Sequence, residues 1–71
     1  MNAVAPIVST IWRLDVAVGQ RVEVGQQLAL LESMKMEIPV SAPVAGVVAD
    51  LPAAIGQIVQ EGDPVAVISP A

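Results

Sequence analysis

The stretch GQRVEVGQ at residues 19–26 recurs as GQIVQEGD at residues 56–63. In each copy two glycines enclose a short segment centred on a valine, Val22 in the first and Val59 in the second. Glycine tolerates the positive φ angles that tight connections between strands often need. The glycine spacing differs from that of a phosphate-binding loop, and no lysine directly follows either copy. We therefore predict that each stretch forms a turn, a short strand and a second turn.

The repetition extends well beyond these turns. Residues 5–32 align with residues 42–69 without a gap, and nine of the 28 aligned pairs are identical. Eight of the other 19 pairs exchange one aliphatic residue for another, as Val18 and Ile55 do. Two units are too few for a solenoid, which needs a longer stack of repeats to bury a core. We therefore expect two similar halves that pack face to face about a pseudo-two-fold axis.

The composition favours strands over helices. The chain contains 13 Val, 6 Ile and 5 Leu, so most of its large aliphatic side chains are β-branched and suit a pleated surface. Its 5 glycines and 6 prolines interrupt any sustained helical periodicity. We predict an all-β fold, a flattened barrel or sandwich of two small antiparallel sheets with about eight short strands. The length of 71 residues allows one domain, which we take to be residues 1–71.

Composition also excludes several classes of function. The mean hydropathy is +0.72, but no apolar run approaches the ~18–20 residues that span a bilayer. With 3 basic and 7 acidic residues and a single aromatic side chain, nucleic-acid binding is not expected. Because histidine and cysteine are absent, the usual general base, thiol nucleophile and zinc ligands are missing, so we expect no metal and no catalysis. The lack of cysteine and of a signal peptide predicts the reducing cytoplasm.

Between the repeats lies the segment LESMKMEIPV, residues 31–40. Its apolar flanks indicate strands, and its polar centre indicates a hairpin tip over residues 33–36. The tip carries Lys35, the only lysine of the chain. Met34 and Met36 bracket it, and at strand spacing they would share one face while Lys35 points to the other. A two-fold axis would pass close to this tip, and the chain termini would lie at the opposite end.

Two interpretations of the tip remain open on these grounds. A lone lysine in a turn is commonly only solvated. Exposed flexible methionines, however, are typical of a surface that another molecule recognises.

The segment ESMKME, residues 32–37, resembles the Ala/Ser-Met-Lys-Met attachment motif of biotinyl domains. The two glycine stretches and APVAGVV at residues 42–48 resemble the same biotinyl/lipoyl attachment family, over about residues 4–69. The resemblance implies a barrel-sandwich hybrid fold and an amide between Lys35 and biotin, formed by a biotin protein ligase. It further implies a carrier that shuttles carboxyl groups between the active sites of a biotin carboxylase and a carboxyltransferase.

The resemblance also implies roles for the neighbours of the lysine. Met34 and Met36 would serve recognition by the ligase and positioning of the biotin arm. Glu32 and Glu37 would either contact basic residues of a partner or keep the tip soluble. Ser33 stands where alanine is commoner in the family, and both residues are small.

Three departures from the family pattern carry expectations of their own. Ser9 stands where many members have glycine, so the first turn is expected to differ. Pro52 falls in a stretch that is strand-like in relatives, and because proline cannot donate to a ladder we expect an edge strand or bulge there. No insertion follows Leu14, where bacterial acetyl-CoA carboxylase carriers have a protruding thumb, so the chain resembles the thumbless class.

Two alternatives to a biotin carrier remain. The first is a lipoyl carrier, although lipoyl tips usually read Asp-Lys-Ala and methionines flank the lysine here. The second is an unmodified structural or adaptor module with the same fold, although such modules lack the tip lysine. The mass of the intact protein after co-expression with each ligase separates the three functions.

Overall fold

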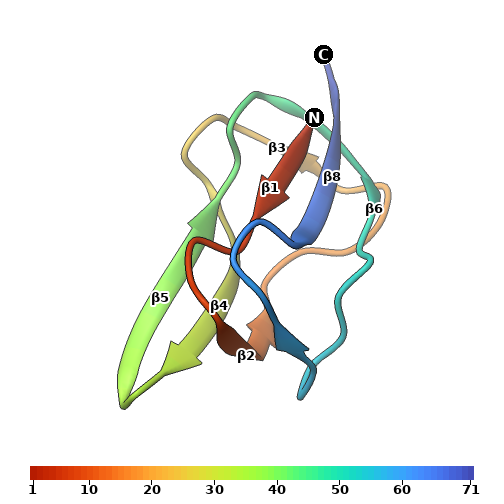
Figure 1. Ribbon diagram of the computed structural model, residues 1–71. Coiled ribbons are helices and arrows are strands. Elements are labelled where there is room, and N and C mark those ends of the chain that lie inside the picture. The colour runs from red at the N-terminus through yellow and green to blue at the C-terminus, as the bar shows by residue number, and fades with distance from the viewer.

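The computed structural model describes all residues 1–71, and its secondary structure consists of eight β-strands (Figure 1). None of its elements is an apolar helix of membrane-spanning length. In chain order the strands are β1 (Asn2–Val4), β2 (Ser9–Leu14), β3 (Arg21–Val22), β4 (Gln27–Ser33), β5 (Met36–Ser41), β6 (Gly46–Asp50), β7 (Ile58–Val59) and β8 (Pro64–Pro70).

The strands form two antiparallel four-stranded sheets that are related by the sequence repeat. One sheet has the order β1-β8-β6-β3 and the other the order β5-β4-β2-β7. A shift of 37 residues turns β1 into β5, β8 into β4, β6 into β2 and β3 into β7, so it converts the first order into the second. The predicted all-β fold and its pseudo-two-fold symmetry are therefore confirmed.

The glycine turns join each half of the chain to the other half. Gly19, Gly25, Gly56 and Gly62 all have φ between 83° and 91°, as the turn prediction requires. Each turn glycine donates its backbone N–H to a carbonyl of the opposite repeat. These four bonds run from Gly19 to Val48 (2.8 Å), Gly25 to Ala42 (2.9 Å), Gly56 to Ile11 (2.7 Å) and Gly62 to Ala5 (2.8 Å). Neither repeat therefore satisfies its backbone alone.

One hydrophobic core of 16 buried residues holds the two repeats together. Its largest fully buried side chains form four pairs spaced by 37 residues, so each repeat contributes the same inward positions. The pairs are Ile11 and Val48, Val22 and Val59, Leu28 and Val65, and Leu31 and Ile68.

The two halves differ where Ser9 in one corresponds to Gly46 in the other. A Cβ on Gly46 would lie 2.1 Å from the carbonyl oxygen of Ser69, so only glycine allows β6 to pair with β8 as far as Pro70. Ser9 has a Cβ, and the β2–β4 ladder begins one pair later, at Thr10 and Glu32. The end of β4 is therefore released from β2. The expected difference at Ser9 is a difference in register, and the Ser9 hydroxyl donates to the carbonyl of Ile7.

Pro52 does not lie in an edge strand or a bulge, so that expectation is wrong. Strand β6 ends at Asp50, and Pro52 follows in the connection to β7. The equivalent position in the first half is Asp15, whose backbone N–H donates to the carbonyl of Leu28 at 2.8 Å. Proline has no N–H with which to make the matching bond, so the ladder stops earlier in the second half.

The chain ends lie at the end of the molecule opposite the β4–β5 tip, as predicted (Figure 1). The expectation that the two-fold axis passes close to the tip is wrong. The axis relates each residue to the one 37 positions along the chain, so Met34 at the tip corresponds to Ala71 at the chain end. The axis therefore exchanges the tip with the chain ends. The Cα trace is elongated, measuring 35 × 18 × 18 Å.

Candidate functional site

Strands β4 and β5 form a protruding hairpin that ends in a two-residue turn (Figure 1). Ser33 pairs with Met36, and the residues between them are Met34 and Lys35. Both have positive φ, 49° at Met34 and 66° at Lys35. Positive φ at both central residues is the mark of a type I′ turn, which matches the right-handed twist of the strands. The predicted hairpin tip is therefore present, in a conformation that glycine or asparagine would adopt more readily.

The strand spacing on which the predicted arrangement of the two methionines depends is not present. Side chains alternate between faces only in an extended strand, and Met34 and Lys35 instead occupy the left-handed region of the turn. Only Met36 belongs to a strand. Met34 is 91% exposed and Met36 is 58% exposed, so neither packs into the core.

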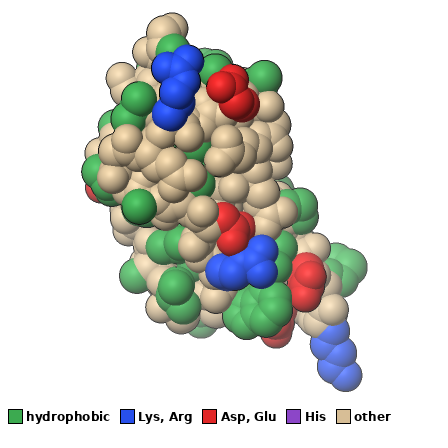
Figure 2. All heavy atoms as spheres, turned by 180° about the vertical axis from the view of Figure 1, so that it is seen from behind, with side chains coloured by type: hydrophobic (Ala, Val, Ile, Leu, Met, Phe, Trp, Pro, Cys, Tyr) green, Lys and Arg blue, Asp and Glu red, His purple; other side chains and the backbone are tan.

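Lys35 carries the one free amine of the chain. Its side chain is exposed and makes no hydrogen bond or ion pair, whereas the N-terminal amine of Met1 donates to the carbonyl of Ile68 at 2.7 Å. Figure 2 shows a basic side chain that projects alone from a corner of the molecule, and Lys35 is the only basic residue in the β4–β5 hairpin. An amine presented in this way fits the formation of an amide with the carboxyl group of a cofactor.

Glu32 and Glu37 lie directly opposite each other across the hairpin, one pair before the turn. Both side chains are exposed, and neither has a basic partner within the chain. Like charges in facing positions destabilise an antiparallel pair. The tip is therefore flanked by two carboxylates that a cation from outside the chain would neutralise.

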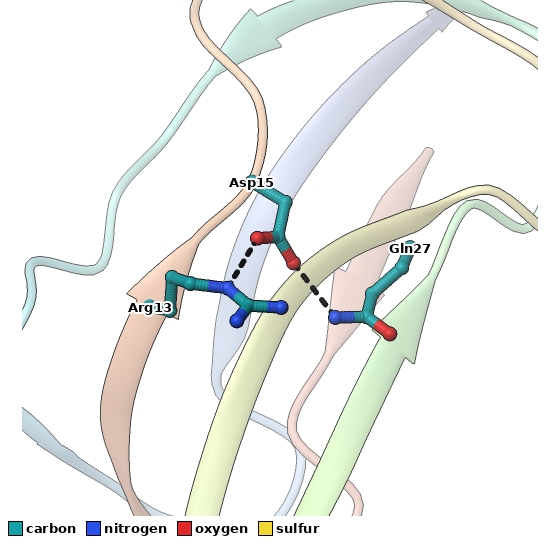
Figure 3. Close-up of polar contacts among 3 residues, drawn as sticks. All are labelled: Arg13, Asp15 and Gln27. Carbon is teal, nitrogen blue, oxygen red and sulfur yellow. Dashed lines mark hydrogen bonds and ion pairs between the residues drawn. The ribbon is translucent and has the colours of Figure 1, made fainter.

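One polar cluster, which the sequence did not predict, lies on the same sheet. The Arg13 Nε donates to Asp15 Oδ1 at 2.5 Å, and Gln27 Nε2 donates to Asp15 Oδ2 at 2.8 Å (Figure 3). The bond from Arg13 and that from Gln27 hold the pKa of Asp15 below its ordinary value of 3.8. The sequence shows that Arg13 and Asp15 lie two residues apart, which could have suggested their ion pair. Gln27 begins β4, so its place in the cluster depends on how the strands pair.

The surface has no pocket, and no group of three acidic side chains is placed to hold a metal ion. What the fold offers is a rigid body with one reactive group at its protruding end. These features are those of a small carrier domain with an exposed lysine at its end.

The chain belongs to the biotin/lipoyl family, described as biotin-requiring enzymes, whose model matches residues 2–68. It is 48% identical over 65 residues to the "Biotinylated protein TB7.3 homolog" of Mycobacterium leprae, covering 92% of each chain. It is 40% identical over 63 residues to the "Biotin/lipoyl attachment protein" of Bacillus subtilis, covering 89% of this chain and 86% of that one.

Solved structures show the same fold inside much larger proteins. A single-chain, multi-domain long-chain acyl-CoA carboxylase matches with a TM-score of 0.92 and 30% identity, over 100% of this chain and 7% of that chain. The urea carboxylase of Kluyveromyces lactis matches with a TM-score of 0.91 and 33% identity, over 97% of this chain and 6% of that chain. The family and these neighbours make the chain a biotin carrier of the kind that serves biotin-dependent carboxylases.

Proposed function

We propose that Lys35 carries the biotin, joined through an amide between its Nζ and the carboxyl group of the cofactor. The observation that supports this proposal is the single unpartnered amine at the end of the β4–β5 hairpin. When attached, biotin supplies a ureido nitrogen that accepts and gives up a carboxyl group. The protein itself performs no step of the reaction, because it has no histidine or cysteine and no enclosed site.

The contribution of the chain is tethering. A short covalent arm on a rigid body holds its end group at a high effective concentration near any active site that the body reaches. The turn keeps Lys35 exposed, and its amine makes no ion pair with any carboxylate of the chain. The proposal therefore assigns to the fold the task of presenting one amine to several enzymes in turn.

The partners in this proposal are a biotin protein ligase, which attaches the cofactor, and the biotin carboxylase and carboxyltransferase that share it. Met34 and Met36 offer the ligase exposed, adaptable apolar contacts on either side of the amine. Glu32 and Glu37 offer basic side chains of a partner two facing carboxylates. Ser33 leaves room beside the turn, since it is the smallest residue of the tip. We place these events in the cytoplasm.

The mass of the intact protein tests the attachment site. After co-expression with a biotin ligase, the wild-type chain should gain the mass of one biotin and the Lys35→Ala variant should gain none. Lys35→Arg keeps the charge and serves as a matched control, which should also stay unmodified. Biotinylation of the Lys35→Ala protein would reject the proposal. So would a wild-type protein that stays unmodified while the same ligase modifies a second carrier.

A lipoyl group is the second candidate, because the similar protein of Bacillus subtilis is called a biotin/lipoyl attachment protein. The same turn presents the same amine to either ligase. Co-expression with a lipoyl ligase in place of the biotin ligase distinguishes the two, since the two groups add different masses. Modification by lipoate alone would replace biotin in the proposal, and Lys35 would remain the site.

A further inference from the structure

The outer face of the sheet that bears the tip carries Trp12, the only aromatic residue of the chain. Ile11 pairs with Leu31 and Arg13 pairs with Leu30, so Trp12 is the extra residue of a bulge in β2. Ile11 and Leu31 belong to the core, so Leu30 lies on the outer face beneath the bulge, where it is nevertheless buried at 7% exposure. Trp12 is 50% exposed.

The repeat provides an internal comparison for this position. The bulge in β6 lies between Val48 and Asp50, and the residue that corresponds to Trp12 is Ala49. The neighbouring outward residue Ile58, which is 66% exposed, corresponds to Arg21. The same bulge thus forms with an alanine beside a charged residue. The bulge itself therefore does not require a tryptophan, and the half of the Trp12 side chain left in water has a cost that another interaction would offset.

Arg13 follows Trp12 in the chain, and its side chain is bound to Asp15. Its Nε is bound to Asp15, which Gln27 holds in turn, while the two terminal nitrogens of the guanidinium have no partner in the chain (Figure 3). Figure 2 shows hydrophobic, basic and acidic side chains gathered on one face near the projecting basic side chain. An indole surface and free N–H donors therefore lie next to each other on the tip-bearing sheet.

This pair lies within reach of an arm on Lys35. A strand rises ~3.3 Å per residue and neighbouring strands lie ~4.8 Å apart, so the tip is about 13 Å from Trp12 when measured along β4 and across to β2. An extended lysine with a biotin chain has about eleven bonds between its Cα and the ring system, which span ~14 Å in staggered conformations. The corresponding residue, Ala49, lies on the other sheet, toward the chain ends.

We propose that Trp12 and Arg13 form a docking site for the biotin headgroup of the chain's own arm. The thioether ring packs on the indole, since sulfur and aromatic rings attract each other, and the Arg13 terminal N–H groups donate to the ureido carbonyl oxygen. The proposal rests on attachment at Lys35. It gives the carrier a resting position that shields the headgroup between visits to the carboxylase active sites.

Tryptophan fluorescence tests this docking directly, because Trp12 is the only tryptophan. The mass of each sample first establishes complete modification, so a failure of attachment is distinguished from a failure of docking. On biotinylation we expect a blue shift of the emission and a roughly twofold fall in quenching by acrylamide, as for an aromatic surface covered by a tethered ring. Identical spectra and quenching for the modified and unmodified proteins would overturn the proposal and leave this face to a partner protein.

Two variants serve as matched controls. The double variant Trp12→Ala, Ala49→Trp moves the indole to the equivalent bulge on the other sheet, where biotinylation should leave the fluorescence unchanged. Arg13→Gln keeps the indole and removes the charged donors, so it should weaken the response to biotinylation. A response in the double variant equal to that of the wild type would show a general effect of modification and contradict docking at Trp12.

Discussion

Lys35 and its neighbour Met34 adopt the left-handed backbone conformation that side chains with a Cβ disfavour. Each such residue costs about 1–2 kcal/mol relative to its preferred conformation. The surrounding strands impose this turn. β4 and β5 pair in one register from Leu30 with Pro39 as far as Ser33 with Met36, so only two residues remain to connect the strands. The strain keeps the lysine in a tight corner, where neither neighbour shields its amine.

Replacing Met34 with asparagine should therefore raise the stability of the protein. Asparagine tolerates positive φ better than methionine, and Met34 is too exposed for the change to remove packing. We expect a gain of about 0.5–1 kcal/mol in the free energy of unfolding, measured by urea titration. Met34→Ala is the matched control, with no gain, and a loss of stability in Met34→Asn would contradict the strained turn.

Asp15 predicts a dependence of stability on pH. Its pKa is lowered in the folded protein by hydrogen bonds from Arg13 and Gln27, so the stabilisation is present above the ordinary value of 3.8. It is lost as the pH falls through the lower folded-state value. Thermal melts at about pH 6 and pH 3 should show a smaller acid loss for Asp15→Asn than for the wild type. An equal acid loss in both proteins would show that the cluster in Figure 3 is not formed in solution.

Among the elements, the β4–β5 hairpin protrudes because β2 supports it over only part of its length. The first pair between β2 and β4 is Thr10 with Glu32, whereas β6 pairs with β8 as far as Pro70. The last pair of the hairpin, Ser33 with Met36, therefore lacks β2 beside it, whereas the matching end of β8 is still paired with β6. An arm attached there projects beyond the body, as a carrier requires.

Gly46→Ala tests the close approach that makes this difference. The new Cβ would lie 2.1 Å from a backbone oxygen of β8, so the two strands must separate. We expect a loss of about 3 kcal/mol in the free energy of unfolding, measured by chemical denaturation. Ser9→Gly at the equivalent site is the matched control and should cost less than half as much. Equal costs at the two sites would contradict the register difference.

At the scale of the whole molecule, stability comes from two halves that complete each other. The turn glycines of one repeat bond to strands of the other, and the core is built from four repeated pairs. Neither half has enough buried surface or satisfied backbone to fold alone. The body is therefore a single cooperative unit.

Val22→Ala and Val59→Ala should destabilise the protein equally, because each side chain is 1% exposed in an equivalent position. Each change removes two buried methyl groups, for which we expect about 2 kcal/mol and a shift in Tm of about 8–16 °C. The double variant should lose about the sum of the two. Single-variant costs that differ by more than about 1 kcal/mol would contradict the energetic equivalence of the halves.

Most of the fold followed from the sequence. The repeat of 37 residues predicted two matching sheets, the glycines predicted the turns, and the polar centre of the segment between the repeats predicted the tip. Each of these features is local or periodic, so it is visible along the chain. Pro52 was misplaced because a proline alone does not show whether a strand bends around it or ends before it.

What the sequence determined by itself is therefore the strand pattern, the symmetry and the identity of the exposed amine. Only the tertiary structure decided how Met34 and Lys35 are oriented, since a two-residue connection forces both into positive φ once the register of β4 and β5 is set. It also decided that Trp12 occupies a bulge beside an oriented Arg13. These features depend on how separate strands align, and alignment is fixed by pairing and packing between segments that are distant in the chain.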